Sequence, residues 1–189
     1  MVLLLRGQSL VTIILFSLTT PTVSAKFDNP ALQCSALSIL LPNKVSYPNS
    51  STYFNTTQSY WFQQARLAPA CIVKPTSTLD VAVIVGALNV VHKVTPGNSL
   101  FAIKSGGHTP INGSANDNGG VTIDLTLMDS LKVNQKKTVT SVGAGSIWSN
   151  IYAQLDLQNL TVSGGRVAGI GVGGLLTGGK SCYQPKTTT

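Results

Sequence analysis

Apolar positions at helical spacing mark the clearest elements of the chain. Residues 78–94 carry valine, isoleucine and leucine three and four positions apart, which predicts an amphipathic helix with Ser77 or Thr78 as its N-cap. A similar pattern predicts a second helix over residues 146–158. Two shorter helices are expected before prolines, over residues 34–41 and 59–68.

Between these segments, short runs rich in β-branched residues predict strands. They cover residues 71–75, 100–107, 121–126 and 136–145. A loop from Gly106 to Gly120 separates the second run from the third. Because helices and strands are mixed, the predicted fold class is α+β.

The first 25 residues have the pattern of a secretory signal peptide. A basic Arg6 precedes an apolar run from Leu10 to Leu18, and the segment ends in small residues before Lys26. The apolar run is too short to span a bilayer, so we expect a secreted, extracellular protein that is not anchored in a membrane once residues 1–25 are removed.

Secretion agrees with four Asn-x-Ser/Thr sequons. Asn49 and Asn55 lie in a polar run that should be exposed, and we expect them to carry glycans. For Asn112 we expect packing or a ligand to cover the side chain. The fourth sequon begins at Asn159.

Three cysteines follow the signal segment. In an oxidising compartment Cys34 and Cys71 are the natural disulfide pair, which leaves Cys182 without a partner. Buried free thiols are the alternative.

The formal net charge of +7 reflects few acidic residues rather than many basic ones, since the chain has only six Asp and Glu. No basic run is interleaved with aromatic residues, so nucleic-acid binding is not expected. A mild positive field suits an anionic ligand such as a phosphate.

Glycines gather in four places: residues 106–107, 119–120, 143–145 and 164–179. Each cluster alone is typical of a tight turn, but together they favour backbone nests for an elongated phosphorylated ligand. The run GIGVGG matches the dinucleotide pattern only by coincidence, because no acidic residue follows Asp156. No P-loop, nucleophile elbow or metal-ligand cluster is present either, so no metal site is predicted.

Three ordered motifs carry a family resemblance: AIKSGGHTPINGSANDNGG with the following VTIDLT, then VTSVGAGSIWSNIYAQL, then TVSGGRVAGIGVGGLLTGG. Together they resemble the FAD-binding domain of berberine bridge enzyme-like oxidoreductases of the vanillyl-alcohol-oxidase type, most closely the secreted fungal members. The lead segment and PACIVKPTS fit the same group. The resemblance implies the N-terminal portion of such a domain, incomplete at its C-terminal side.

The resemblance also implies which residues hold FAD. His108 matches the histidine that many members bond to the 8α-methyl carbon of the flavin. The position matching a second, cysteine link is Val167, so only a single covalent link is implied. Cys34–Cys71 would be the family's N-terminal disulfide. The cofactor-binding set comprises His108, Lys104, Ser105, Gly106, Gly107, Gly113, Ser114, Gly143, Gly145, Val172, Gly173, Gly174, Thr177 and Gly178.

The implied organisation is a signal peptide (1–25), a lead segment (26–67), a partial FAD-binding domain (68–179) and an atypical tail (180–189). A complete relative would be an oxidase that transfers a hydride from an alcohol, sugar or secondary-metabolite substrate to FAD, which O₂ reoxidises. The substrate domain and its catalytic base are expected to lie beyond this chain, so the catalytic residues are unknown. The alternative is a non-catalytic secreted glycoprotein or an inactive truncated fragment.

Overall fold

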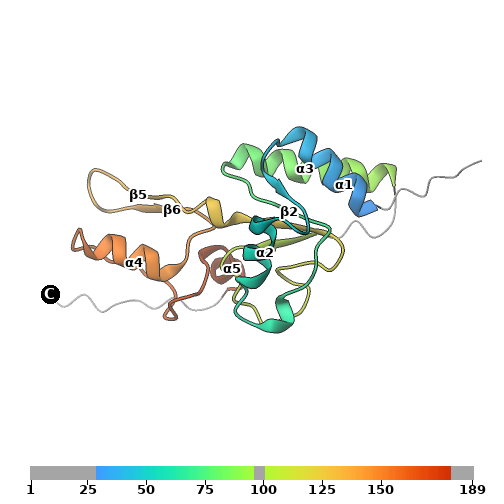
Figure 1. Ribbon diagram of the computed structural model, residues 1–189. Coiled ribbons are helices and arrows are strands. Elements are labelled where there is room, and N and C mark those ends of the chain that lie inside the picture. The colour runs from blue at the N-terminus through green and yellow to red at the C-terminus, as the bar shows by residue number, and fades with distance from the viewer. Residues whose placement is uncertain (1–28, 96–100, 180–189) are drawn as a thin grey trace, which may run out of the picture.

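The computed structural model describes residues 29–95 and 101–179 as a mixed helix and sheet structure (Figure 1). The predicted signal peptide and tail, with Cys182, lie outside these residues. The elements are α1 (Asn29–Leu40), β1 (Val45–Ser46), α2 (Ser51–Gln58), η1 (Gln63–Ala65), β2 (Cys71–Val73), α3 (Thr78–Val94), β3 (Phe101–Lys104), β4 (Val121–Asp124), η2 (Leu125–Leu127), β5 (Leu131–Val133), β6 (Thr140–Val142), α4 (Trp148–Asp156) and α5 (Val172–Thr177).

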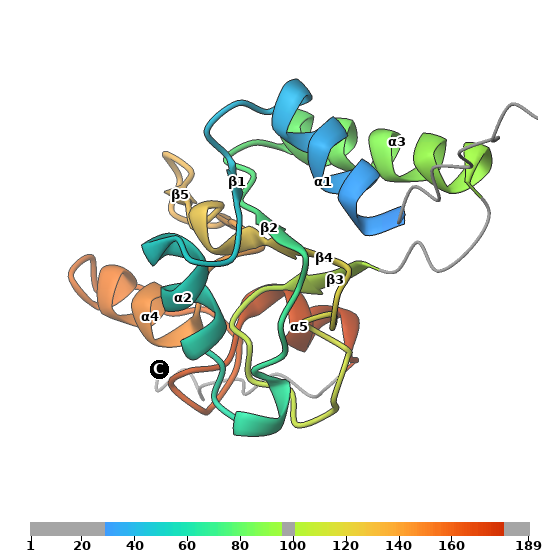
Figure 2. The ribbon, with the colours of Figure 1, turned by 45° about the vertical axis from the view of Figure 1, so that its right-hand side comes forward.

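The main sheet has the strand order β1-β2-β4-β3. Strands β2, β4 and β3 are parallel, with Cys71 and Phe101 both in register with Val121, whereas β1 is antiparallel to β2. Helices α1 and α3 cover one face of this sheet, and α2 and α5 lie on the other side (Figure 2). Because β2, β4 and β3 are parallel, their carboxyl ends lie at the same edge of the main sheet.

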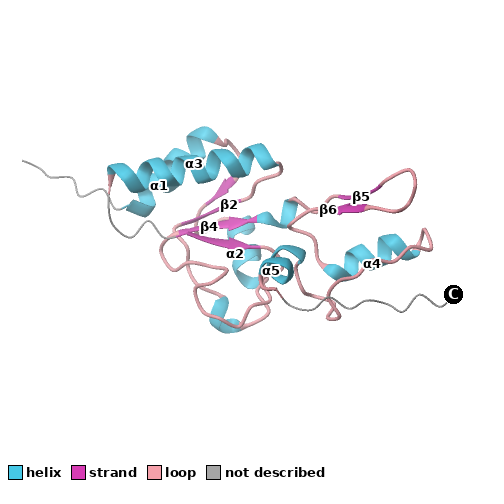
Figure 3. Ribbon diagram, turned by 180° about the vertical axis from the view of Figure 1, so that it is seen from behind, coloured by secondary structure: helices cyan, strands magenta, loops and turns pink. Residues whose placement is uncertain are grey.

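Two of the apolar clusters formed by the described residues support this arrangement. The first lies between α1, α3 and the sheet and is built from fully buried residues such as Leu37, Ile84 and Ile123. The second joins α4 and α5 through Trp148, Ile151 and Leu175, beside the β5–β6 hairpin that extends from the sheet (Figure 3). The predicted helix over 78–94 is confirmed as α3, and Ser77 is its N-cap.

The predicted helix over 59–68 is wrong. Only the short 3₁₀ helix η1 forms there, because Tyr60 is drawn into the interior and the amide of Asn116 binds the carbonyl oxygens of Ala65 and Leu67. The helix that does form, α2, lies just upstream, where the Ser50 hydroxyl accepts a hydrogen bond from the N–H of Tyr53.

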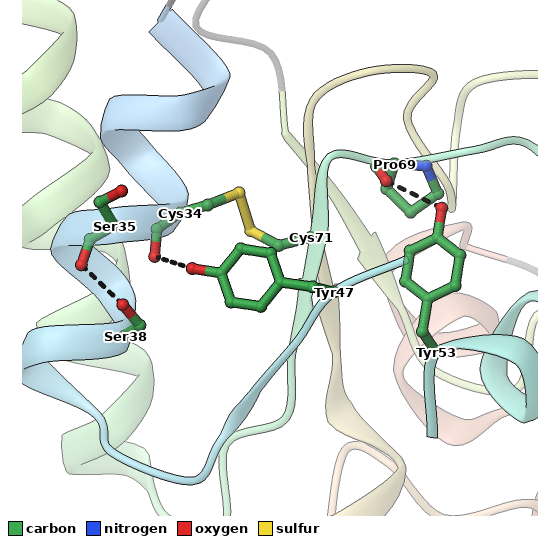
Figure 4. The surroundings of a disulfide bond; sticks show 7 residues. All are labelled: Cys34, Ser35, Ser38, Tyr47, Tyr53, Pro69 and Cys71. Carbon is green, nitrogen blue, oxygen red and sulfur yellow. Dashed lines mark hydrogen bonds between the residues drawn. A yellow bond between two sulfur atoms is a disulfide. The ribbon is translucent and has the colours of Figure 1, made fainter. Parts of the chain in front are cut away.

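A disulfide between Cys34 and Cys71 confirms the predicted pair and joins α1 to the start of β2 (Figure 4). Beside it, the Tyr47 hydroxyl donates to the carbonyl oxygen of Cys34 at 3.1 Å. The Tyr53 hydroxyl likewise donates to the carbonyl oxygen of Pro69 at 2.8 Å. These bonds attach the lead segment to the sheet.

Asn49 and Asn55 are exposed, which makes both side chains accessible to glycan attachment. Asn112 is exposed as well, so the expectation that packing covers it is wrong. Among the helices formed by residues 29–95 and 101–179, none is long and apolar enough to cross a membrane.

Asp80 organises the start of α3. Its carboxylate pairs with the Lys44 ammonium and accepts hydrogen bonds from the N–H groups of Thr76 and Ser77. The hydrogen bond from Lys44, followed by that from the Thr76 backbone, lowers the pKa of Asp80 below its usual value. Asp80 and Ser77 also form a capping box.

We expect the stabilising effect of Asp80 to depend on pH. Because the pKa of Asp80 is lowered in the folded state, its contribution is fully present above the unfolded-state value of about 3.9 and fades as the pH falls below it. Urea titrations of the wild type and Asp80→Asn should therefore differ most above about pH 5 and converge toward pH 2. A difference that grows on acidification would contradict this account.

Candidate functional site

The candidate site lies where β3 ends and its following loop begins. Lys104 is in register with Asp124, so the loop that starts at Ser105 leaves the sheet at its carboxyl edge. The glycines at 119–120 precede β4 and lie at the opposite edge. Of the four glycine clusters predicted to act together, this one therefore lies away from the loop that follows β3.

A buried ion cluster supports this edge. The two carboxylate oxygens of Asp124 pair with Lys104 at 3.4 Å and with Lys74 at 3.2 Å, and the Lys104 side chain is only 4% exposed. Burial lowers the pKa of Lys104, against the opposing effect of Asp124. Lys104, which the sequence predicts to bind the cofactor, lies beneath the loop, and its ammonium forms an ion pair with Asp124.

Tyr60 closes the other side of this cluster. Its ring lies 5.4 Å from the Lys104 ammonium, and its buried hydroxyl donates to the carbonyl oxygen of Ala115 at 2.8 Å. Burial, followed by the charge of Asp124, raises the pKa of Tyr60. A side chain on Gly107 would meet both the Tyr60 ring and the Lys104 stem at 3.2 Å.

The loop presents unused backbone donors. Among the hydrogen bonds of the described residues, none uses the N–H groups of Gly106, Gly107, His108 or Thr109. Gly107 has a positive φ of 66°, which favours glycine. Successive free N–H groups around such a residue form a concavity that suits an anion.

Two distant glycine segments pack directly against this loop. The Ser105 hydroxyl and the Gly173 N–H both donate to the carbonyl oxygen of Ala144, at 2.7 and 3.3 Å. A Cβ on Gly171 would lie 2.2 Å from the backbone nitrogen of Gly106. Conversely, a Cβ on Gly106 would lie 2.5 Å from the backbone nitrogen of Gly171. Neither position has room for a side chain.

Gly143 and Gly145 are glycine for a different reason. Side chains there would overlap the carbonyl oxygens of Met128 and Leu125. Gly145 also lines a cleft of about 190 Å³ between η2 and α4. These glycines therefore shape the backbone around Ala144, which reaches the loop after β3.

The remaining predicted residues lie around this contact. Val172 is buried and donates its N–H to the carbonyl oxygen of Ser146 at 2.9 Å, while Gly174 faces open space. The Thr177 hydroxyl bonds to the carbonyl oxygen of Gly173 within α5, and Gly178 is the C-cap of that helix.

The loop after His108 contains the other two predicted residues. Gly113 has a φ of 81° and an open side-chain position, and the Ser114 hydroxyl donates to the carbonyl oxygen of Ile111 at 2.9 Å. Both residues are exposed, so they form a surface turn.

His108 lies between aromatic side chains. Its ring stacks on Trp61 at 5.0 Å between centroids and meets the edge of Phe62 at 6.2 Å. A Cβ on Gly169 would lie 3.3 Å from the imidazole. The Nε2 atom is buried and has no hydrogen-bond partner in the described part of the chain.

Several site residues were missed from the sequence. The predicted helix over 59–68 includes Tyr60-Trp61-Phe62, although three adjacent aromatic side chains would point in different directions around a helix. The sequence does contain one signal for Asp124, because it is an acidic residue at the end of a strand whose other residues are buried. The role of Ala144 depends on a backbone carbonyl, which no side chain could have indicated.

Comparison with known proteins identifies the fold. Residues 69–188 match the FAD binding domain family. A FAD-dependent monooxygenase of Emericella nidulans is 37% identical over 153 residues, which are 81% of this chain and 31% of the relative. The chain therefore spans about a third of the length of this relative.

Solved structures of flavin-dependent enzymes share this fold. The Physcomitrella patens BBE-like 1 variant D396N has a TM-score of 0.61 at 21% identity, covering 75% of this chain and 30% of its own. The Acremonium strictum glucooligosaccharide oxidase has a TM-score of 0.62 at 22% identity, and the match covers 76% of this chain and 29% of the oxidase. That oxidase carries a 6-S-cysteinyl, 8α-N1-histidyl FAD. The predicted vanillyl-alcohol-oxidase type of fold is confirmed.

Because Gly171 touches the backbone of Gly106, Gly171→Ala should displace the loop and lower the thermal midpoint of unfolding. We expect a loss of about 1–3 kcal/mol, the usual cost of overpacking. Gly86→Ala is the matched control, since its side-chain position is open in the middle of α3. The control should be stabilised by about 0.5–1 kcal/mol. Equal midpoints for Gly171→Ala and the wild type in calorimetry would contradict the observed packing.

Proposed function

Because the chain belongs to the FAD binding domain family, we propose that it is the cofactor-holding part of a flavin-dependent oxidoreductase whose FAD is bonded to His108 alone. FAD supplies an acceptor for a hydride taken from substrate. Residues of the Lys104–Ser114 loop would hold it, together with the segments around Ala144 and Gly173.

The single observation that carries this proposal is the row of free N–H groups from Gly106 to Thr109 beside His108. Such a row is suited to the charged oxygens of a pyrophosphate. Asp124 does not oppose an anion here, because its charge is balanced by Lys74 and Lys104. The residues present thus fit the cofactor that the family binds.

His108 is the proposed point of attachment. Its Nε2 atom is enclosed, with Gly169 close to that side of the ring, which leaves Nδ1 for the bond to FAD. In the Acremonium strictum oxidase the FAD carries an 8α-N1-histidyl and a 6-S-cysteinyl link. Here Val167 stands at the predicted position of that cysteine, and the cysteines of the described residues are joined in the Cys34–Cys71 disulfide. We therefore propose a histidyl link only.

The substrate would be a small molecule, namely an alcohol, a sugar or a secondary-metabolite intermediate, and O₂ the electron acceptor. The relatives are named monooxygenases, whereas our expectation is an oxidase. The two activities are separable by experiment, since an oxidase releases hydrogen peroxide without placing an oxygen atom in the product. Neither the substrate site nor a catalytic base is assigned to residues described here.

We further propose that the protein is secreted and glycosylated at Asn49 and Asn55. The exposure of both asparagines and the Cys34–Cys71 disulfide support this proposal. An inactive glycoprotein remains the alternative, and it differs from the proposal in carrying no flavin.

The test is expression of the full chain in a secretory yeast, followed by fluorescence of the denatured band in a gel. We expect a fluorescent band for the wild type and loss of that band in His108→Ala, since no other attachment point is proposed.

His92→Ala is the control, because His92 lies in the last turn of α3. It should keep the fluorescence of the wild type. Folded wild-type protein without bound flavin would refute the cofactor role, and unchanged fluorescence in His108→Ala would refute the assigned link.

A further inference from the structure

Trp61 contacts the proposed anchor in a way that core packing does not explain. Trp61 is 67% exposed, whereas the adjacent Tyr60 is 1% exposed. Its indole nevertheless lies nearly parallel to the His108 imidazole, at an interplanar angle of 18°. This exposed side chain therefore stacks on the histidine.

The backbone holds Trp61 in this place. Its N–H donates to the carbonyl oxygen of Gly107 at 3.2 Å, directly before His108. The segment after α2 and the loop after β3 consequently run side by side (Figure 2). Tyr60 fixes the start of this segment through its bond to Ala115.

A histidine with a chemical role is usually oriented by a hydrogen bond to one ring nitrogen. Within residues 29–95 and 101–179, the His108 side chain makes no such bond. Its orientation is instead limited by Trp61 on one face, by Phe62 at 6.2 Å and by Gly169. Gly106 and Gly107 add no side chains of their own, so the stack on Trp61 is a direct restraint on the ring.

We propose that Trp61 is a positioning residue: its indole holds the His108 imidazole in the orientation from which the bond to FAD forms. This inference rests on the proposed function. Trp61 neither donates nor accepts a proton in this role.

The step that Trp61 would assist is balanced as follows. Nδ1 of His108 would form a bond to the 8α carbon of FAD, while one C–H bond of that carbon and one N–H bond of the imidazole break. The isoalloxazine would take up the two electrons and two protons released, and O₂ would then accept them from the reduced flavin to give hydrogen peroxide.

The experiment compares Trp61→Ala, Trp61→Phe and the wild-type full chain. The covalent fraction is the flavin fluorescence of the denatured band divided by total FAD. We expect attachment in Trp61→Ala to be about 2- to 10-fold slower, the range expected for losing one aromatic pair. Trp61→Phe should recover most of the wild-type rate, because phenylalanine retains a stacking face.

Phe54→Ala is the matched control, since Phe54 is an aromatic side chain on α2 with 61% exposure. It should attach FAD at the wild-type rate. If the wild type attaches FAD and Trp61→Ala does so equally fast, the positioning role is refuted while the proposed function stands. If the wild type attaches no FAD, both the positioning role and the proposed function are refuted.

A second measurement needs no FAD. In NMR spectra of the full chain, the ring protons of His108 should move in Trp61→Ala because the indole ring current is lost, and should keep their shifts in Phe54→Ala. Unchanged His108 shifts in Trp61→Ala would show that the two rings do not stack, which would overturn the inference independently of the cofactor.

Discussion

The proposed flavin site depends on the buried carboxylate of Asp124. It lies at the end of β4 and pairs with Lys104 at the end of β3 and with Lys74 just after β2. The carboxyl ends of three parallel strands are thereby held at one level. Removing one member of a buried ion pair typically costs about 3–5 kcal/mol, because the remaining charge has no partner. The loop that carries His108 begins one residue after Lys104, so this pairing fixes where the loop starts.

From that fixed point, backbone contacts bring together segments that are far apart in the sequence. The carbonyl oxygen of Ala144 accepts from both Ser105 and Gly173, and Gly106 meets Gly171 with no space for a side chain. The N–H groups of residues 106–109 are left without an acceptor in the described part of the chain. A site of this kind would bind an anion through backbone N–H groups rather than through charged side chains. Few charged residues in the sequence would therefore mark such a site.

The sequence predicted those parts of the fold that local pattern determines. Spacing of apolar residues located α3, and Ser77 identified its start. The cysteine count and the family resemblance both gave the Cys34–Cys71 pair. The hairpin strand β5 was missed because only two apolar residues, Leu131 and Val133, mark it, with Lys132 between them.

The site was only partly predictable for a related reason. The resemblance selected His108 and the glycines around it, but Trp61 was assigned to a helix that does not form. Its place depends on the burial of Tyr60 and on the bond to Gly107, both of which join residues more than 40 positions apart. Tertiary contacts of this kind override local propensity and leave no local trace.

The central claim is that the backbone between Gly106 and Thr109 binds the pyrophosphate of FAD. Amide hydrogen exchange of the full chain, with and without added FAD, measures this directly. The account predicts that these four amides exchange rapidly in the free chain and are selectively protected by FAD, while amides within α3 are unchanged. Equal exchange of the four amides in the presence and absence of bound FAD would contradict it.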